Sequence, residues 1–329
     1  MCTNPITLTH KGTTWCEAKS LQVPCGKCLE CKIQYQNQIF IRLYEESKSH
    51  KHIVFFTLTY KPSSVPYFCD KDTGETFNTV YKFHIQSWLK RFRTRYSRTN
   101  SNLAKFKYFI TSEYGPRTLR PHYHGVIFGL SKNDLAPLFN DWRKKCGFVH
   151  VRGLHPGNAR YLQNVIRYVA KYCSKGEFEN PRVDHGLVDK TFHLQSKKLG
   201  YGYIDRMRKW HLSAPFRRFD KHYNYNVNYL DAILDKRYYT LDGFRYNLPR
   251  YYKNKIYGEQ SRLSYALSNR IFTNISSIRD LQLEQIQAQR NCTYIEADNI
   301  LRFQEDEQHK HRYKQAKAKY EAFLNKSQL

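Results

Sequence analysis

The chain has 329 residues, and its 55 lysines and arginines against 28 acidic residues give a formal net charge of +27. This excess indicates a polyanionic partner, and an aromatic content of 16% favours single-stranded nucleic acid, whose bases stack on rings. No apolar run approaches the ~20 residues that span a bilayer, and the N-terminal MCTNPITLTHKG lacks the apolar core of a signal peptide. We therefore expect no membrane association, and a cytoplasmic chain whose nine cysteines stay reduced.

The N-terminal segment is rich in cysteine. The stretch PCGKCLEC places Cys25, Cys28 and Cys31 at a C-x2-C-x2-C spacing, and Cys16 is a candidate fourth thiolate. Reduced cysteines at this spacing suit a structural Zn²⁺ ion. An iron–sulfur cluster is the alternative metal, and cysteines without any metal are the third interpretation. Bound zinc would anchor the start of a helix that we predict over residues 32–47.

The region from about 50 to 176 has an ordered succession of strand and helix patterns. The predicted elements are a strand at 52–60, a helix at 80–96, strands at 106–113 and 122–129, a helix at 133–145 and a strand at 147–152. This β-α-β-β-α-β order is that of ferredoxin-like and RRM-like domains. We therefore predict an α+β fold, with an antiparallel sheet that has helices on one face and leaves the other face open to a ligand.

Three side chains are predicted to converge on the open face of this sheet. His122 and His124 lie two residues apart in a strand, so they point to the same side. If the preceding loop closes symmetrically, Glu113 lies opposite His122 and points to that side as well. Two imidazoles and one carboxylate suit a divalent ion such as Mn²⁺ or Mg²⁺, with Thr57 and Thr59 lining the same face. The alternative is that both are ordinary surface or core histidines.

The loop between these two strands, YGPRTLRP, carries Arg117 and Arg120. Both are candidates for contacts with DNA phosphates, because guanidinium groups bind phosphate oxygens well. Ordinary solvated loop charge is the competing interpretation.

A helix is predicted over residues 158–174, with Gly176 expected to end it. Its apolar residues cluster on one side at 100° per residue. Tyr168 and Tyr172 lie one turn apart on the flank of that stripe, where we expect them to face outward from the edge of the core. Lys171 and Lys175 fall further round the same flank.

Two phenols beside two ammonium groups have a specific chemical use. A phenol with a pKa near 10 is a poor nucleophile at pH 7, and neighbouring positive charge favours the phenolate. Tyrosine is among the side chains that form covalent intermediates, and a metal can polarise the phosphate under attack. Attack on a DNA phosphodiester would leave a 5′-phosphotyrosine and a 3′-hydroxyl, ready for later rejoining. In a chain with 27 tyrosines, packing residues are the alternative.

Several of these motifs resemble those of one known family. HYH (His122–His124) fits the His-hydrophobic-His motif of the HUH endonucleases, and FFTLTY (Phe55–Tyr60) looks like their first-strand motif. YVAKYCSK (Tyr168–Lys175) is similar to the paired-tyrosine motif of replication initiators from Microviridae. The gokushovirus type of initiator also has the EYG…RPHYH arrangement and an N-terminal PCGKC cluster. The resemblance covers roughly residues 1 to 210.

The resemblance implies rolling-circle replication initiation, with origin nicking, covalent attachment and strand rejoining. By matching positions it makes His122 and His124 metal ligands and Tyr168 and Tyr172 nucleophiles, whereas Glu113 as third ligand rests on the hairpin argument. The implied partners are single-stranded and replicative-form DNA together with a host helicase and polymerase, in the cytoplasm of a bacterial host. We expect Lys171 to aid the tyrosines or to contact phosphate, and Lys175, Arg117 and Arg120 to contact DNA.

Beyond about residue 216 the pattern changes to a Tyr- and Asn-rich stretch, then a Gln-rich helix over 278–289 and a charged helical tail over 300–324. We therefore predict three parts. They are a cysteine-rich segment with its helix (1–50), an HUH endonuclease domain (51–215) and a mainly helical accessory region (216–329).

Three other functions stay open on the sequence. A transposase or relaxase of a mobile element would use the same site chemistry. A non-enzymatic DNA-binding regulator with a zinc module would use only the charge and the cysteines. A 2-His-1-carboxylate iron oxygenase would use the predicted ligand set, but the basic charge and the tyrosine helix count against it.

Overall fold

The computed structural model describes residues 2–10, 19–99, 106–115, 118–179, 181–212, 238–256 and 275–301, with isolated positions from 303 to 318. The chain divides into two compact units, one of residues 1–34 with 253–329 and one of residues 35–252. None of the helices in the described part combines the length and apolar character that crossing a bilayer requires. The predicted boundaries after residues 50 and 215 stay predictions.

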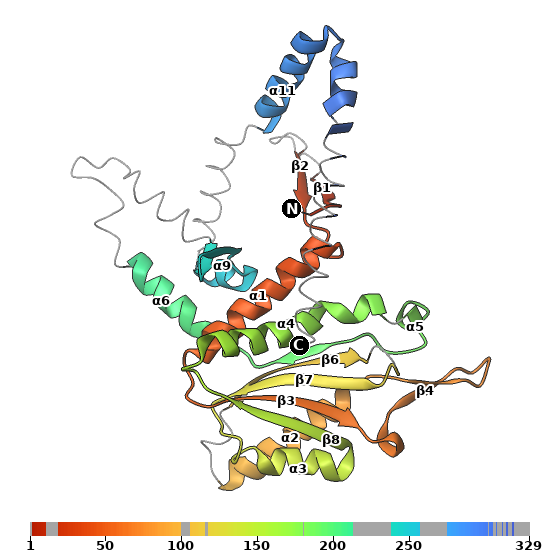
Figure 1. Ribbon diagram of the computed structural model, residues 1–329, viewed down its shortest axis with the longest axis vertical. Coiled ribbons are helices and arrows are strands. Elements are labelled where there is room, and N and C mark those ends of the chain that lie inside the picture. Colours follow the sequence, from red (N-terminus) through yellow and green to blue (C-terminus); the bar gives the residue numbers. More distant parts are fainter. Residues whose placement is uncertain are drawn as a thin grey trace. The chain divides into compact units, whose positions relative to one another are not determined.

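The unit of residues 35–252 contains a five-stranded antiparallel sheet in the order β8-β3-β7-β6-β9 (Figure 1). Its strands are β3 (Ile53–Tyr60), β6 (Lys107–Tyr114), β7 (Pro121–Phe128), β8 (Gly147–Leu154) and β9 (His193–Gln195). The intervening helices are α2 (Lys82–Thr99) and α3 (Ala136–Lys145). The predicted β-α-β-β-α-β order, and with it the α+β class, is confirmed. The short edge strand β9 is an addition that the sequence did not suggest.

The remaining elements surround this sheet in the chain order. A turn of 3-10 helix (Pro62–Ser64) and a hairpin of β4 (Tyr67–Cys69) and β5 (Thr76–Asn78) lie between β3 and α2. After β8 come α4 (Ala159–Glu179), α5 (Pro181–Asp184), α6 (Tyr201–Leu212), a hairpin of β10 (Tyr238–Leu241) and β11 (Phe244–Asn247), and α9 (Arg250–Ile256). The hairpin lies in the region predicted to be mainly helical.

The other unit holds a hairpin of β1 (Ile6–His10) and β2 (Lys19–Val23), the first residues of α1 (Leu29–Ser47) and α11 (Ile275–Arg290). The predicted Gln-rich helix is therefore present, and residues 294–301 form the next helical segment. That segment starts with a capping box, in which Thr293 and Glu296 exchange side-chain and backbone hydrogen bonds. Leu283 of α11 packs against Ala297 and Leu301.

Strand β3 shows why one face of the sheet forms the core. Its alternation of buried and half-buried residues sends Val54, Phe56, Leu58 and Tyr60 toward α2 and α3. These side chains join Trp88, Trp142 and Phe139 in a single apolar cluster. The odd-numbered residues of β3 therefore point to the opposite face, as the period of a strand requires.

That opposite face is not open, as the sequence suggested, because α4 packs over β6 and β7 (Figure 1). The prediction that the helix ends at Gly176 is also wrong, since α4 continues to Glu179. A glycine inside a helix costs about 1 kcal/mol, which packing can outweigh. Near β8 the face remains exposed, with Phe148, His150 and Arg152 in solvent.

Helix α1 is fixed to this unit by a buried carboxylate. Glu46 accepts hydrogen bonds from His50, from the Lys107 ammonium at 2.9 Å and from the Gly200 N–H at 2.7 Å. Burial raises the pKa of Glu46, but these donors outweigh it, so the pKa lies below its ordinary value and the carboxylate stays charged. The ionised group joins α1 to β6 and to the segment before α6.

The tightest point of the core gives a stability test. A Cβ at Gly125 of β7 would lie 2.3 Å from Phe56 Cζ, whereas a Cβ at Gly153 of β8 would meet nothing within 4 Å. We expect Gly125→Ala to destabilise the protein by about 1–3 kcal/mol, as overpacked cores are, and Gly153→Ala to be close to neutral. Thermal unfolding of both variants measures this. Equal melting temperatures for the two would contradict the packing.

Candidate functional site

The sheet register brings the predicted ligands into two neighbouring rows on the face opposite the core. Strands β6, β7 and β3 pair Glu113 with His122 and His122 with Thr59 in one row. The next row pairs His124 with Thr57 and with Thr111. The prediction that Glu113 lies opposite His122 is therefore confirmed. A β-strand alternates sides, so these residues share one face.

The two threonines of β3 orient the two histidines. Thr57 Oγ1 lies 3.1 Å from His124 Nδ1, and Thr59 Oγ1 lies 3.0 Å from His122 Nδ1. Each Nδ1 atom is thus engaged by a hydroxyl, which leaves Nε2 as the coordinating atom of each ring. Metal-binding histidines generally have such a partner on the other nitrogen, because it fixes the ring and its tautomer.

The carboxylate of Glu113 pairs with His124. Its Oε2 atom lies 2.8 Å from His124 Nε2, and both side chains are buried, each with 7% of its surface exposed. Neighbouring ligands of an octahedral ion with bonds of about 2.1 Å lie about 3 Å apart. The separation of these two donors is therefore compatible with a shared divalent ion.

His122 is held in a form suited to coordination. Burial lowers its pKa below the ordinary value, and the charges of His124 and Arg120 act in the same direction while Glu113 opposes them. A neutral imidazole is the form that binds a metal. In addition, a Cβ at Gly115 would lie 3.0 Å from His122 Nε2, so the glycine keeps this nitrogen approachable.

The donors do not yet form a closed cage. Within the described ranges, the group of three or more candidate ligands that gathers its donor atoms within 4.8 Å is Cys2, Cys25, Cys28 and Cys31. Glu113, His122 and His124 share a face without meeting that condition. Their role as a metal-ligand set therefore stays a prediction.

The two tyrosines of α4 pack directly on this face. The ring of Tyr172 stacks on His124 with centroids 4.2 Å apart and an interplanar angle of 11°. Tyr168 meets the same imidazole edge-on at 5.6 Å and lies 5.0 Å from Tyr172. The expectation that both tyrosines face outward is wrong, because the flank that carries them is turned to β7. Tyr172 is 7% exposed and Tyr168 is half-buried.

The other predicted site residues are placed less centrally. Lys171 is buried, and its backbone carbonyl accepts a hydrogen bond from Gln36 of α1 at 3.2 Å. Arg120 is half-buried at the start of β7, close enough to influence His122. The following predicted residues lie outside the described residues, wholly or by their side chains: Cys16, Arg117 and Lys175.

Sequence reasoning missed a third histidine on this face. His193 of β9 pairs with Thr111, and its Nε2 lies 3.1 Å from the hydroxyl of Tyr35. Burial lowers its pKa, with Arg42 and Lys82 contributing, so it stays neutral. The three-residue strand was too short to give a periodic signal.

The exposed edge of the same face was missed as well. Phe148, His150 and Arg152 pair with Thr59, Thr57 and Phe55 of β3, so they share the face of the histidines, and we call them the β8 strip. Phe148 is 62% exposed. The Arg152 guanidinium lies 4.9 Å from the ring of Tyr161. The alternation in FVHVR could have indicated these residues once the neighbouring register was known.

Comparisons with known proteins agree with the site. Residues 53–177 match the family model of the replication-associated protein ORF2, a segment that includes the histidines, Glu113 and both tyrosines. The class indicated is therefore that of replication-associated proteins.

Three curated relatives narrow this class to small phages. The replication-associated protein VP4 of Bdellovibrio phage phiMH2K is 26% identical over 59% of this chain and 59% of its own length. ORF4 of Chlamydia phage 1 is 26% identical over 79% and 60%, and ORF2 of Spiroplasma virus 4 is 35% identical over 54% and 49%. The chain thus spans 49–60% of the length of these relatives. The resemblance to replication proteins of Microviridae-type phages is confirmed.

One solved structure is also similar in part. It is the N-terminal nuclease domain of the minute virus of mice non-structural protein 1, described with Zn²⁺ coordination in its active-site pocket. The identity is 13% and the TM-score 0.20, over 53% of this chain and 81% of that one. At this level of likeness no residue can be transferred from one protein to the other.

The threonine contacts can be tested separately from the histidines. We expect Thr57→Val to weaken Mn²⁺ binding about 10- to 100-fold, the usual cost of losing a partner that orients a metal ligand. Thr240→Val, on exposed β10, is the matched control and should bind Mn²⁺ as the unmodified protein does. Isothermal titration with Mn²⁺ measures both. Unchanged affinity in Thr57→Val would remove the threonine from the metal site.

Proposed function

We propose that the protein is a rolling-circle replication initiator that nicks single-stranded DNA by tyrosine attack and later rejoins the strand. The observation that carries the proposal is the packing of Tyr168 and Tyr172 on His124, whose Nε2 faces Glu113. Two candidate nucleophiles thus lie against the candidate metal ligands. The match of residues 53–177 to a replication-associated family supports the same function.

The residues divide the reaction among them. His122, His124 and Glu113 would hold a divalent metal, Mg²⁺ or Mn²⁺, which when bound would polarise the scissile phosphate. A tyrosine loses its proton and its phenolic oxygen forms a bond to phosphorus, while the bond to the 3′ oxygen breaks and that oxygen takes up a proton. The 5′-phosphotyrosine keeps the bond energy. Attack by a 3′-hydroxyl reverses these steps and releases the tyrosine.

The two tyrosines have different access to a phosphate. Tyr168 is half-buried, whereas Tyr172 is 7% exposed and stacked on His124. Tyr172 has to break its stacking contact before it can attack, whereas Tyr168 meets the ring only by its edge. We therefore assign the first attack to Tyr168 and the second to Tyr172. Lys171 assists from the same turn of α4.

The DNA substrate is best accommodated along the β8 strip. The covered half of the sheet lies under α4, whereas Phe148 and Arg152 present an exposed ring and an exposed positive charge. Exposed rings stack bases, and guanidinium groups meet phosphates. The formal net charge of +27 adds a general attraction to DNA. We place the reaction in the bacterial cytoplasm, on single-stranded and replicative-form DNA, with a host helicase and polymerase.

A covalent adduct is the direct test of the chemistry. The protein is incubated with circular single-stranded phage DNA and Mn²⁺, and adducts are resolved on a denaturing gel. We expect the unmodified protein and a Tyr294→Phe control to form the adduct, and the double variant Tyr168→Phe with Tyr172→Phe to form none. Tyr294 is 56% exposed and lies outside the sheet unit.

The single variants test the order of attack. Tyr168→Phe should lose most of the first-turnover adduct, and Tyr172→Phe should keep it but fail in repeated rounds. An adduct that persists in the double variant would exclude these tyrosines as nucleophiles. A larger loss in Tyr172→Phe would reverse the proposed order.

The β8 strip has its own prediction. Phe148→Ala should weaken binding to a single-stranded oligonucleotide by about 1–3 kcal/mol, the usual worth of one stacked base. Arg152→Ala should also lower the salt dependence by about one phosphate contact. Fluorescence anisotropy at several salt concentrations measures both, with Phe244→Ala on β11, 67% exposed, as control. Equal losses in Phe148→Ala and Phe244→Ala would rule out a specific strip.

A further inference from the structure

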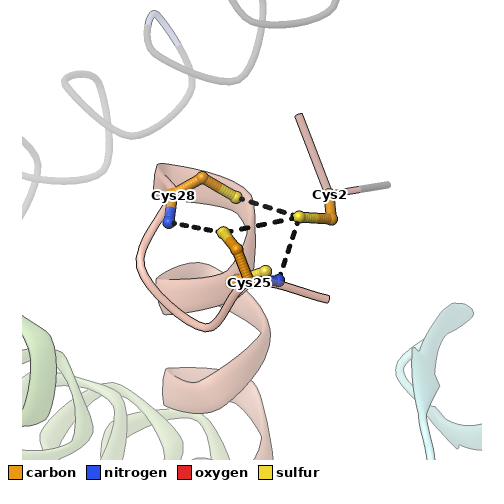
Figure 2. A group of neighbouring side chains, drawn as sticks. Cys2, Cys25 and Cys28 are labelled. Atoms are coloured by element: carbon orange, nitrogen blue, oxygen red, sulfur yellow. Dashed lines mark hydrogen bonds between the residues drawn. The ribbon is translucent and has the colours of Figure 1, made fainter. Parts of the chain in front are cut away.

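The four cysteine side chains near the N-terminus come together in space. The sulfur atoms of Cys2, Cys25, Cys28 and Cys31 all lie within 4.8 Å of one another. Cys2 Sγ is 3.5 Å from Cys25 Sγ and 3.7 Å from Cys28 Sγ (Figure 2). All four are free thiols, since a disulfide would need a separation of about 2.05 Å.

We propose that Cys2, Cys25, Cys28 and Cys31 bind one structural Zn²⁺ ion, with Cys2 as the ligand that the sequence did not suggest. Zinc–sulfur bonds of about 2.3 Å in a tetrahedron place the sulfurs about 3.8 Å apart, close to the observed separations. One ion fits between sulfurs this close. An iron–sulfur cluster, in which each cysteine binds a different iron, would need the sulfurs further apart.

Backbone N–H groups support the sulfurs as thiolates. The N–H groups of Lys27 and Cys28 donate to Cys25 Sγ at 3.4 and 3.2 Å, and the N–H of Cys25 donates to Cys2 Sγ at 3.3 Å. Figure 2 shows these side chains converging around a common centre. Donors aimed at sulfur offset the negative charge of four thiolates around a doubly charged ion.

The position of the group explains what a metal would do there. Strands β1 and β2 form a two-stranded sheet whose first pair is Ile6 with Val23. Cys2 precedes this pair and Cys25 follows it, so a shared ion would close the open end of the hairpin. A lone hairpin of two strands is marginally stable in water, so closure by a metal would contribute directly to its folding.

The same ion would fix the start of α1. The carbonyl of Cys28 accepts the N–H of Lys32 at 3.0 Å, which is the first bond of the helix, and Cys31 lies in the first turn. Zinc bound to both cysteines would hold this turn closed. We therefore assign the ion a structural role that is independent of the proposed nicking reaction.

Metal analysis of the purified full-length chain tests the site. The protein is expressed with zinc and iron both supplied, and its metal content is measured by mass spectrometry. We expect about one zinc per chain, as for other four-cysteine sites, and loss of most of it in Cys2→Ser and Cys28→Ser. Cys69→Ser is the matched control, because Cys69 is exposed on β4 away from the group, and it should retain zinc. Cys16→Ser should retain zinc too.

Two further measurements keep the test decisive if a variant fails to fold. Cobalt added to the metal-free unmodified chain should give the intense visible absorption of a tetrahedral thiolate site, and chelation should speed amide exchange in β1 and β2. A chain that carries no metal, or iron in place of zinc, would overturn the proposal. Full zinc content in Cys2→Ser with loss in Cys16→Ser would overturn the assignment of Cys2.

Discussion

The antiparallel register of β6 and β7 is the constraint on which the candidate site depends. It aligns Glu113 with His122 across the hairpin, and the register of β7 with β3 adds the two threonines. A shift by one residue would send every one of these side chains into the apolar core. Gly125 helps to prevent such a shift, because its missing side chain leaves room for Phe56 on the core side. Core packing and site geometry are therefore two results of one register.

Helix α4 adds a second layer to that register. Its tyrosines stack on His124, while the carbonyl of Lys171 is held by Gln36 of α1, and α1 is in turn fixed by the buried Glu46. Each contact is made by residues far apart in the sequence. The candidate nucleophiles are thus positioned by a chain of packed helices as well as by their own strand neighbours. This arrangement suits a reaction in which the reacting atoms must be held within a few ångströms.

The sequence predicted the parts of this arrangement that have a strict period. Strand alternation fixed the shared face of His122 and His124, and helical spacing placed Tyr168 and Tyr172 on one flank. Periodicity says which residues share a face but not which neighbour covers it, so the inward direction of the tyrosines could not be predicted. Cys2 and β9 were missed because a contact across 20 or more residues, or a strand of three, leaves no local pattern. The Asp242–Gly243 turn, with positive φ at both residues, was a readable hairpin signal that was overlooked.

The uneven cover of the sheet has an electrostatic consequence. At the β8 strip the side chains lie in water, whereas two strands away His124 and Glu113 are almost fully enclosed beneath α4. Charges interact far more strongly as the surrounding dielectric constant falls. A phosphate that moves across the sheet from β8 toward β7 would leave its hydration shell behind on the way. The face is therefore a short dielectric gradient, in which attraction at the exposed edge is weak and reversible and the strongest interactions are reserved for the enclosed end.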